Sequence, residues 1–236
     1  MSVPNLESVR RALRRHASAA HAIVSATFFK TGKGEYGEGD RFIGVTVPEI
    51  RAVAEAYRAL PLNDVVRLLR SRIHEERYVA LEMFVDRYRR GDVKTRNTIY
   101  RLYLANTRWI NNWDLVDTSA PHIVGVHLFP HGVATLRRLA RSKNLWERRI
   151  AIIATFHFLR QGRGKETLVI ARLLLHDQHD LIHKAVGWML RELGKLVSRD
   201  ELKKFLDQYA PRMPRTMLRY AIEHFSTKER QKYLRL

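Results

Sequence analysis

The 236-residue sequence contains no cysteine, and this absence excludes several classes of chemistry at once. A chain without thiols forms no disulfides and has no cysteine nucleophile, thiolate metal site or iron–sulfur cluster. Long apolar runs are missing too, because no stretch approaches the ~20 residues that cross a bilayer. Residues 1–7 lack the basic segment followed by an apolar segment that marks a secretory signal. We therefore expect a soluble, cytoplasmic protein with no membrane partner.

Negative charge is also scarce. Lys and Arg together number 43 against 24 Asp and Glu, which gives a formal net charge of +19. Such an excess favours a polyanionic partner, and nucleic acid is the first candidate. Glycine-rich phosphate loops, Gly-x-Ser-x-Gly elbows and His-Glu-x-x-His motifs are absent, so nucleotide hydrolysis, serine hydrolase and metalloprotease activities lack support.

What is present is mostly helical periodicity. One example is the set of apolar residues that would share a helix face, Leu81, Phe84, Val85 and Tyr88. Proline, glycine and serine punctuate the chain at short intervals, which predicts roughly a dozen helices of about ten to eighteen residues. A 45% hydrophobic content can supply a continuous core in a chain of this length.

Three segments of the sequence look related, at residues 76–81, 147–152 and 183–188. The equivalent aliphatic residues Val79, Ile150 and Val186 lie 71 and 36 residues apart. A repeat of about 36 residues is somewhat shorter than the ~40–47 of HEAT and armadillo repeats. We predict one all-α domain over residues 1–236, a HEAT-like solenoid whose concave basic face suits a duplex. An irregular helical bundle is the alternative.

Residues 30–42 interrupt this pattern with four of the twelve glycines and predict a turn or small hairpin rather than helix. The segment is either a DNA probe or a plain interhelical loop. As a probe, it would contact DNA through Lys30, Lys33, Tyr36 and Arg41. Three carboxylates nearly cancel its positive charge, those of Glu35, Glu38 and Asp40.

Residues 111–117 place an indole and two carboxylates within five residues of one another. If residues 113–124 are helical, Trp113 and Asp117 share a stripe. Pro121 lacks the N–H that would bond the carbonyl of Asp117, so we expect a bend or helix end there. The alternative is that Asp114 caps a helix and Trp113 belongs to the core.

A second aromatic and basic group lies in the later segments. Trp188 sits among aliphatic residues, where core is the ordinary interpretation, yet the adjacent Gly187 leaves room beside the indole. Four cations occupy matching places in two repeats, as phosphate clamps would, although each could be solvated surface: Arg148, Arg149, Arg191 and Lys195.

Histidines near residue 180 raise the possibility of a metal site. His179 and His183 are one helical turn apart, and imidazole is a common zinc ligand. The set resembles no complete site, and Asp180 suits a helix N-cap. We expect no metal and no cofactor.

Three blocks together carry a resemblance to a known family: residues 112–117, 144–149 and 184–192. In their order and separation they resemble the AlkD family of DNA alkylation repair glycosylases, from about residue 22 onward. The resemblance implies a HEAT-like solenoid that removes cationic N3- and N7-alkylpurines without flipping the base. It implies an aromatic cleft of Trp113 and Trp188, a catalytic carboxylate at Asp117, and backbone contacts by Arg149 and Arg191.

Two segments depart from the AlkD pattern. Residues 30–42 look longer than the corresponding connection and resemble the hairpin-bearing branch of the superfamily, some of whose members bind DNA structures. Residues 44–48 differ from the polar residues that the AlkD form places near the opposite strand.

The chemistry of the residues agrees with the resemblance. A cationic alkylpurine is already a good leaving group, so one carboxylate can stabilise the sugar cation without a general acid. We predict a monofunctional alkylpurine DNA glycosylase of base excision repair, a monomer acting on double-stranded DNA and associated with the nucleoid. The alternative is a non-enzymatic protein that binds bent, branched or damaged DNA.

Overall fold

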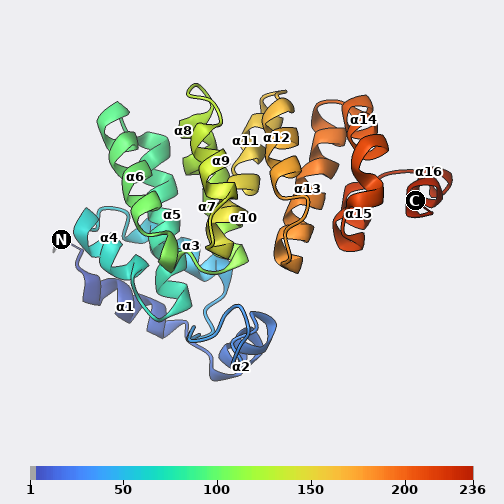
Figure 1. The fold of residues 1–236 in the computed structure, drawn as a ribbon. Helices are drawn as coiled ribbons and strands as arrows, with labels where there is room; N and C mark the ends of the chain where they lie inside the picture. The colour runs from blue at the N-terminus through green and yellow to red at the C-terminus, as the bar shows by residue number, and fades with distance from the viewer. Residues whose placement is uncertain (1–3, 236) are drawn as a thin grey trace. The chain divides into compact units, whose positions relative to one another are not determined.

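The computed structural model describes residues 4–235 and is helical throughout (Figure 1). Within that range there is no strand, only an isolated bridge between Arg41 and Ile73. The predicted all-α class is confirmed. In chain order the α-helices are α1 (Leu6–Arg15), α2 (Ala19–Phe28), α3 (Val47–Ala56), α4 (Leu62–Leu69), α5 (His74–Arg90), α6 (Val93–Ala105), α7 (Trp113–Ala120), α8 (Val126–Leu128), α9 (Ala134–Ala140), α10 (Leu145–Ile153), α11 (Thr155–Arg160), α12 (Lys165–Leu173), α13 (Asp180–Leu196), α14 (Arg199–Tyr209), α15 (Arg215–Ala221) and α16 (Thr227–Leu234). The 3₁₀ turns η1 (Thr107–Trp109) and η3 (Ala210–Arg212) and the π-helix η2 (Pro121–Gly125) complete the described elements.

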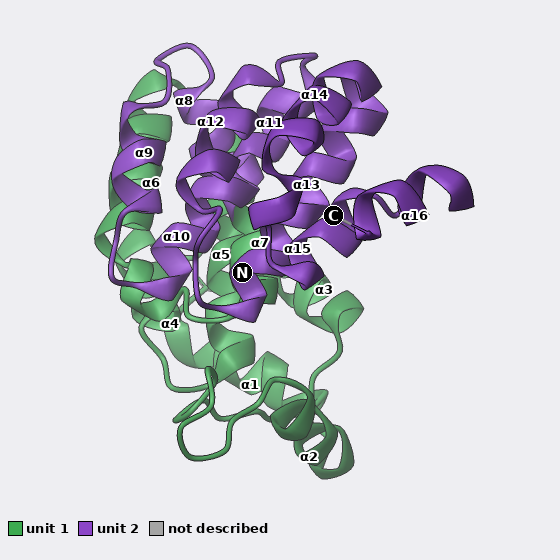
Figure 2. Cartoon of the chain, turned by 45° about the vertical axis from the view of Figure 1, so that its right-hand side comes forward, with its two compact units in different colours: residues 1–119 green, residues 120–236 purple. Residues whose placement is uncertain are grey.

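The chain forms two compact units, one ending at Ser119 and the next beginning at Ala120 (Figure 2). In the first unit, α5 is the central helix and contacts α1, α3, α4 and α6. Of the residues predicted to share its apolar face, Leu81, Phe84 and Tyr88 are buried, and Val85 is half-buried.

In the second unit the central helix is α13, which contacts α10, α11, α12, α14 and α15. Its buried face is aliphatic and consists of Ile182, Val186, Met189, Leu190 and Leu193. No helix among the described residues is both long enough and apolar enough to span a membrane.

The predicted helix boundaries are confirmed where glycine, proline or serine marks them. Pro61 directly precedes α4, and Pro214 directly precedes α15. Gly91 follows the last residue of α5, and the Ser198 hydroxyl caps α14 by accepting the Glu201 N–H. These residues act locally, because each changes the backbone conformations or hydrogen bonds available at its own position.

The three related segments each lie within a helix, on α5, α10 and α13. The loops before α5 and α10 also share a hydrogen-bond pattern. Ser71 and Ser142 each accept a backbone N–H from two residues later, at 3.0 Å in both cases. Their carbonyls accept hydrogen bonds from Arg77 and Arg148, each six residues later, at 3.0 and 3.1 Å. This shared geometry supports the predicted repeat.

Gly187 lets α13 and α15 approach each other closely, as its small size predicts. A Cβ at this position would lie 2.5 Å from the Met217 carbonyl oxygen and 2.5 Å from the Tyr220 Cβ. Neighbouring helix backbone therefore fills the space beside Gly187.

We expect Gly187→Ala to destabilise the protein by about 1–3 kcal/mol, because an added methyl group must push packed helices apart. Gly194→Ala is the matched control on the same helix. Its Cβ would meet the end of the flexible Leu202 side chain, which can move. Urea unfolding of both variants measures the difference, and equal losses would show that the close approach at Gly187 is unimportant.

The glycine-rich residues 30–42 form consecutive turns rather than a hairpin. Their hydrogen bonds are short in range, such as Glu35 N to the Gly32 carbonyl and Asp40 N to the Gly37 carbonyl. Lys30 has a φ of 55°, in the left-handed region. Because the chain turns repeatedly, it leaves no two extended segments to pair. The predicted turn is confirmed for residues 30–42, and the alternative of a small hairpin is not.

Candidate functional site

Trp113 and Asp117 lie one turn apart on α7, at the start of the helix. Both side chains are half-buried, whereas Leu115 and Val116 between them are completely buried. The predicted shared stripe is therefore present, with its indole and carboxylate at the edge of the core.

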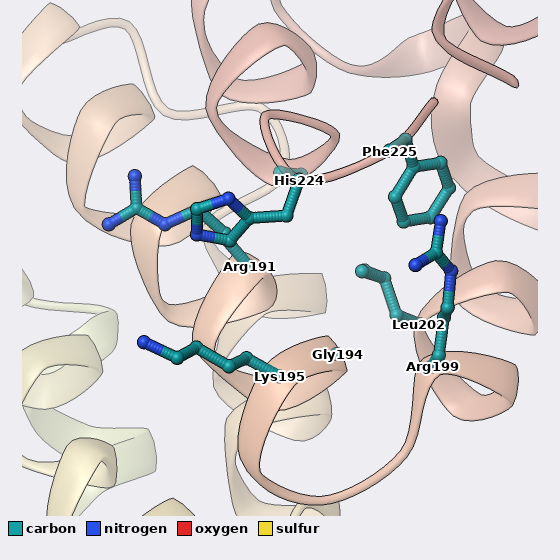
Figure 3. A pocket seen from close by; sticks show the side chains of 8 residues that line it. Arg191, Gly194, Lys195, Arg199, Leu202, His224 and Phe225 are labelled. Carbon is teal, nitrogen blue, oxygen red and sulfur yellow. The ribbon is translucent and has the colours of Figure 1, made fainter. Parts of the chain in front are cut away.

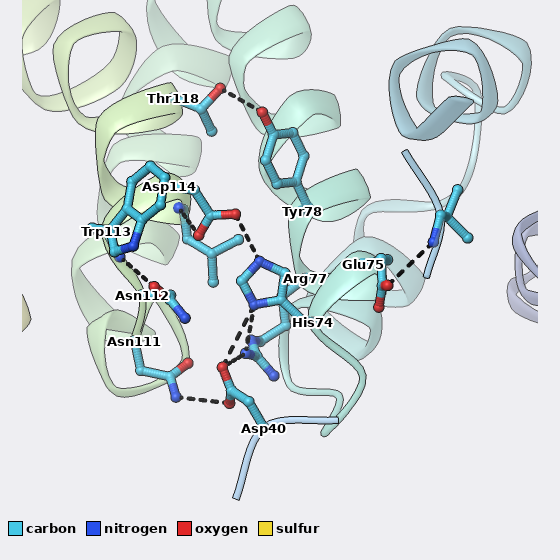
Figure 4. A network of polar contacts seen from close by, with 12 residues as sticks. Asp40, His74, Glu75, Arg77, Tyr78, Asn111, Asn112, Trp113, Asp114 and Thr118 are labelled. Carbon is cyan, nitrogen blue, oxygen red and sulfur yellow. Dashed lines mark hydrogen bonds and ion pairs between the residues drawn. The ribbon is translucent and has the colours of Figure 1, made fainter. Parts of the chain in front are cut away.

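The start of α7 is fixed by short polar contacts. The Asn112 side-chain oxygen accepts a hydrogen bond from the Trp113 N–H at 2.8 Å. The Asp114 Oδ1 accepts one from the Leu115 N–H at 2.8 Å, so part of the predicted capping role is correct. Its other oxygen is directed elsewhere, toward a histidine (Figure 4).

The expected helix end near Asp117 is confirmed. α7 stops at Ala120, and the π-helix η2 begins at Pro121. Pro121 lacks an N–H, so the Asp117 carbonyl cannot receive the usual helical bond. A widened turn is a common result at such a position, and such turns recur at functional sites.

A buried ionic network supports the start of α7 (Figure 4). His74 Nε2 donates to Asp114 Oδ2 at 2.8 Å, and His74 Nδ1 lies 3.5 Å from Asp40 Oδ2. Arg77 Nη2 donates to the same Asp40 oxygen at 2.6 Å, while Asn111 Nδ2 donates to Asp40 Oδ1 at 3.1 Å. The network thus joins two carboxylates and two cationic side chains away from solvent.

Aromatic rings surround the histidine of this network. Phe29 and Phe42 stack with His74, at centroid distances of 5.1 and 4.5 Å. Phe29 also stacks with Trp113 at 5.3 Å, and Phe28 meets the Trp113 ring edge-on at 5.8 Å. Trp113 is therefore held by neighbouring rings on one side of α7.

The network changes the protonation of its members. Burial alone would lower the pKa of His74, but the charge and hydrogen bond of Asp114 outweigh it and raise that pKa. Burial would likewise raise the pKa of Asp40, yet the hydrogen bond from His74 and the charge of Arg77 lower it. Both ring nitrogens of His74 face carboxylate oxygens, which favours the imidazolium.

These shifts predict how the stability of the first unit depends on pH. A raised histidine pKa contributes stability fully below 6.5, the ordinary His74 value, and loses it as pH rises through the shifted value. A lowered carboxyl pKa contributes fully above 3.8, the ordinary Asp40 value, and loses it as pH falls. We expect the combined contribution to be greatest between these values.

The check is urea unfolding of the wild type and His74→Asn across this pH range. The difference in unfolding free energy should be largest in mildly acidic solution and should shrink above neutral pH. The charged groups facing His74 are Asp40, Asp114 and Arg77, and none of them is altered in the variant. A difference that grows with pH would contradict the assigned imidazolium.

The predicted cations of residues 30–42 lie at the surface. Lys30, Lys33 and Arg41 are exposed, and none forms an ion pair with another described residue. Tyr36 is half-buried.

The three carboxylates of the segment are engaged within the protein. Glu35 accepts the Gly32 N–H and Glu38 accepts the Gly34 N–H, each at 2.8 Å. The Asp40 side chain is only 4% exposed and belongs to the buried network. Only Asp40 is paired with a cation inside the protein, whereas Glu35 and Glu38 are exposed beside the lysines.

In the second unit, Trp188 is half-buried on α13 and lies 6.0 Å from the Phe156 ring. At the equivalent repeat positions, Leu81 and Ile152 are completely buried. Trp188 thus differs from a simple core residue by keeping part of its indole accessible.

The predicted cations of the second unit differ in accessibility. Arg148 pairs with Asp177 at 2.6 Å. Arg149 is 5% exposed, and its guanidinium donates to the Leu181 carbonyl at 2.6 Å. In this structure both arginines therefore bind groups within the protein. Their contacts with the DNA backbone stay predictions.

Arg191 and Lys195 line a groove of about 310 Å³ at the end of α13 (Figure 3). Arg191 pairs with Glu192 at 3.2 Å and also with Glu223. Lys195 is exposed. The groove continues past Arg199, whose guanidinium lies over the Phe225 ring at 4.6 Å.

The histidines near residue 180 organise a helix start. His179, rather than Asp180, caps α13, because its Nδ1 accepts the Leu181 N–H at 3.1 Å. His183 Nε2 donates to the Asp177 carbonyl at 2.5 Å. Among residues 4–235, no group of three or more His, Asp or Glu side chains has an arrangement that could hold a metal ion.

Comparisons with known proteins place this helical architecture in a family. A family model described as DNA alkylation repair enzyme matches residues 9–225. The chain belongs to this family. A solved structure described as a predicted DNA alkylation repair enzyme from Enterococcus faecalis shares the fold, with a TM-score of 0.68 at 15% sequence identity. The match covers 90% of this chain and 98% of that one. No curated protein matches the chain.

Family membership confirms the resemblance seen in the sequence, and the structural match confirms an AlkD-like fold. The buried network beneath α7 is what sequence reasoning missed. His74 and Arg77 carried one available signal, since Arg77 lies within the first of the three related segments and His74 lies just before it. Asp40 carried another, as one of three acidic residues among the cations of residues 30–42.

Proposed function

We propose that this family member is a monofunctional DNA glycosylase that removes cationic N3- and N7-alkylpurines from double-stranded DNA. The observation that carries the proposal is the pairing of Trp113 and Asp117 on the accessible edge of α7. An indole and a carboxylate one turn apart suit a cationic nucleotide, since both stabilise positive charge. The net charge of +19 supports a polyanionic substrate.

The proposed reaction needs one carboxylate. The C1′–N bond breaks with its electron pair passing to the alkylated purine, which leaves as a neutral base. Positive charge then develops on the sugar, where the Asp117 carboxylate stabilises it. Water adds to C1′ and loses a proton, which leaves an abasic site. No general acid is required, because alkylation has already made the base a good leaving group.

The aromatic and basic residues have supporting roles in this proposal. The π face of Trp113 attracts the cationic nucleotide, and the family resemblance assigns the same role to Trp188. Exposed cations contact phosphates and hold the duplex without reading its sequence. The proposed phosphate contacts include Lys30, Lys33, Arg41, Arg191 and Lys195. Because no lysine is assigned to form a Schiff base, strand cleavage is not expected.

A second function is a non-enzymatic protein that binds bent, branched or damaged DNA. The exposed cations of residues 30–42 favour it, since Lys30, Lys33 and Arg41 are accessible and the Asp40 carboxylate is paired with Arg77 inside the protein. That segment could bind DNA without any excision.

The deciding experiment is release of free 7-methylguanine and 3-methyladenine from methylated duplex DNA, separated by chromatography. We expect both bases to be released, with strand breaks appearing only after alkaline treatment of the abasic product. Unmethylated duplex is the control substrate. Tight binding to methylated duplex without release of either base would favour the non-enzymatic function.

A further inference from the structure

We infer that Asp40 and His74 are positioning residues that fix the start of α7 to the glycine-rich residues 30–42. The inference rests on the proposed function, because it concerns how Trp113 and Asp117 are held for excision. Neither Asp40 nor His74 reaches the proposed reacting atoms. Their role follows from the elements that they connect.

The ionic path is short and shielded from water. It runs from Asp40 at the end of the segment, through His74 at the start of α5, to Asp114 on α7 (Figure 4). The Asp40 and His74 side chains are 4% and 3% exposed. At such burial an ionic contact is weakly screened and an unpaired charge is costly, so the three groups must move together.

Asp40 also binds Asn111, in the segment just before α7. Its Oδ1 accepts the Asn111 side-chain N–H at 3.1 Å, while its Oδ2 accepts from Arg77 at 2.6 Å. One carboxylate therefore links the glycine-rich residues to both α5 and the segment that leads into Trp113. The two carboxylates of the network face two cations, which leaves the cluster without excess charge.

The backbone strengthens the same attachment. The Arg41 N–H donates to the Arg72 carbonyl at 3.1 Å, and the His74 N–H donates to the Arg41 carbonyl at 2.8 Å. Glu75 Oε1 then accepts the Gly44 N–H at 2.7 Å. The exit of the segment is thus fixed to the first turn of α5.

Stacked aromatic rings form a second set of contacts between residues 30–42 and α7. Phe29 precedes the turns and Phe42 follows them, and their rings stack at 5.1 Å with an interplanar angle of 8°. Phe29 stacks in turn with Trp113. Both ends of the segment therefore meet beside the proposed catalytic indole, so displacing either end disturbs Trp113.

The exposed lysines of the segment and the buried network at its end therefore have different proposed roles. Lys30 and Lys33 add binding energy through phosphates. Asp40 and His74 set the orientation of α7, and with it the positions of Trp113 and Asp117. Misplacement of a reacting group by about 1 Å can cost roughly 100-fold in rate. Loss of the Asp40–His74 network should therefore slow excision itself.

The test compares Asp40→Asn and His74→Asn with Lys33→Gln in single-turnover excision at saturating protein. We expect the two network variants to excise roughly 10- to 100-fold more slowly, the range for misaligned groups, while their affinity for undamaged duplex changes little. Lys33→Gln should weaken affinity for the duplex. Glu166→Gln is the matched control, since it alters a buried carboxylate in the second unit that pairs with the partly exposed Arg163.

A structural readout on the protein without DNA separates positioning from loss of the fold. We expect Asp40→Asn to shift the Trp113 indole N–H resonance, assigned with Trp113→Phe, while the second unit keeps its spectrum. An unchanged Trp113 resonance together with a wild-type saturated rate would overturn the inference. Global loss of dispersed resonances in both network variants would also overturn it, because the network would then support folding in general.

Failure of the proposed function gives a different result. A wild-type protein that releases no alkylated purine contradicts the glycosylase. The resonance of Trp113 still reports whether Asp40 and His74 hold α7, so the link to residues 30–42 is supported or overturned by that measurement alone.

Discussion

Asp117→Asn is expected to excise 7-methylguanine about 100- to 1000-fold more slowly than the wild type, the cost typical of removing one preorganised charge-stabilising group. The substitution keeps the size of the side chain and removes its negative charge, so the developing sugar cation loses its partner. The measurement is single-turnover release from methylated duplex at equal DNA occupancy.

The matched control is Asp200→Asn, which makes the same chemical change at an exposed position in the first turn of α14. It should excise at the wild-type rate. Binding of undamaged duplex by Asp117→Asn should be preserved or slightly tighter, because a carboxylate near phosphates has been neutralised. Wild-type excision by Asp117→Asn would contradict a catalytic carboxylate at this position.

The second large effect is that of salt on DNA affinity. If about six phosphates are contacted, affinity should fall roughly 10³-fold between 50 and 200 mM monovalent salt, through release of counterions. The slope of log affinity against log salt concentration, measured by fluorescence anisotropy on undamaged duplex, gives the number of contacts.

Substituting single cations shows which residues contribute to the slope of log affinity against log salt concentration. Lys33→Gln and Lys195→Gln should each reduce its magnitude by about one contact. Arg149→Gln tests the predicted backbone contact of Arg149, which donates to the Leu181 carbonyl in this structure: a loss of about one contact would support it, and an unchanged slope would overturn it. A wild-type affinity that is flat with salt would contradict a polyanionic partner.

Features that depend on neighbouring residues could be predicted from the sequence. Pro121 has no N–H whatever surrounds it, so the change of helix at that point follows from its chemistry. The stripe of Trp113 and Asp117 follows equally from helical spacing. Ser198 caps a helix because its hydroxyl reaches a backbone N–H within one turn.

Features that depend on distant residues could not be predicted. His74 meets Asp114 across 40 positions of sequence, and Asn111 meets Asp40 across 71. Spacing within a helix carries no information about such pairs. The same limit applies to Arg149, where sequence shows a cation but the fold supplies the carbonyl that binds it inside.

The way residues 30–42 are attached also separates what can vary from what cannot. Their ends are fixed by the stacked rings of Phe29 and Phe42 and by Asp40. Between these points, a Cβ at Gly34 or Gly39 would meet nothing within 4 Å. The exposed turns at Gly34 and Gly39 thus have room for a bound partner or a crosslinker, whereas a Cβ at Gly37 would lie 2.4 Å from the Phe29 carbonyl oxygen, so the chain must keep its path there.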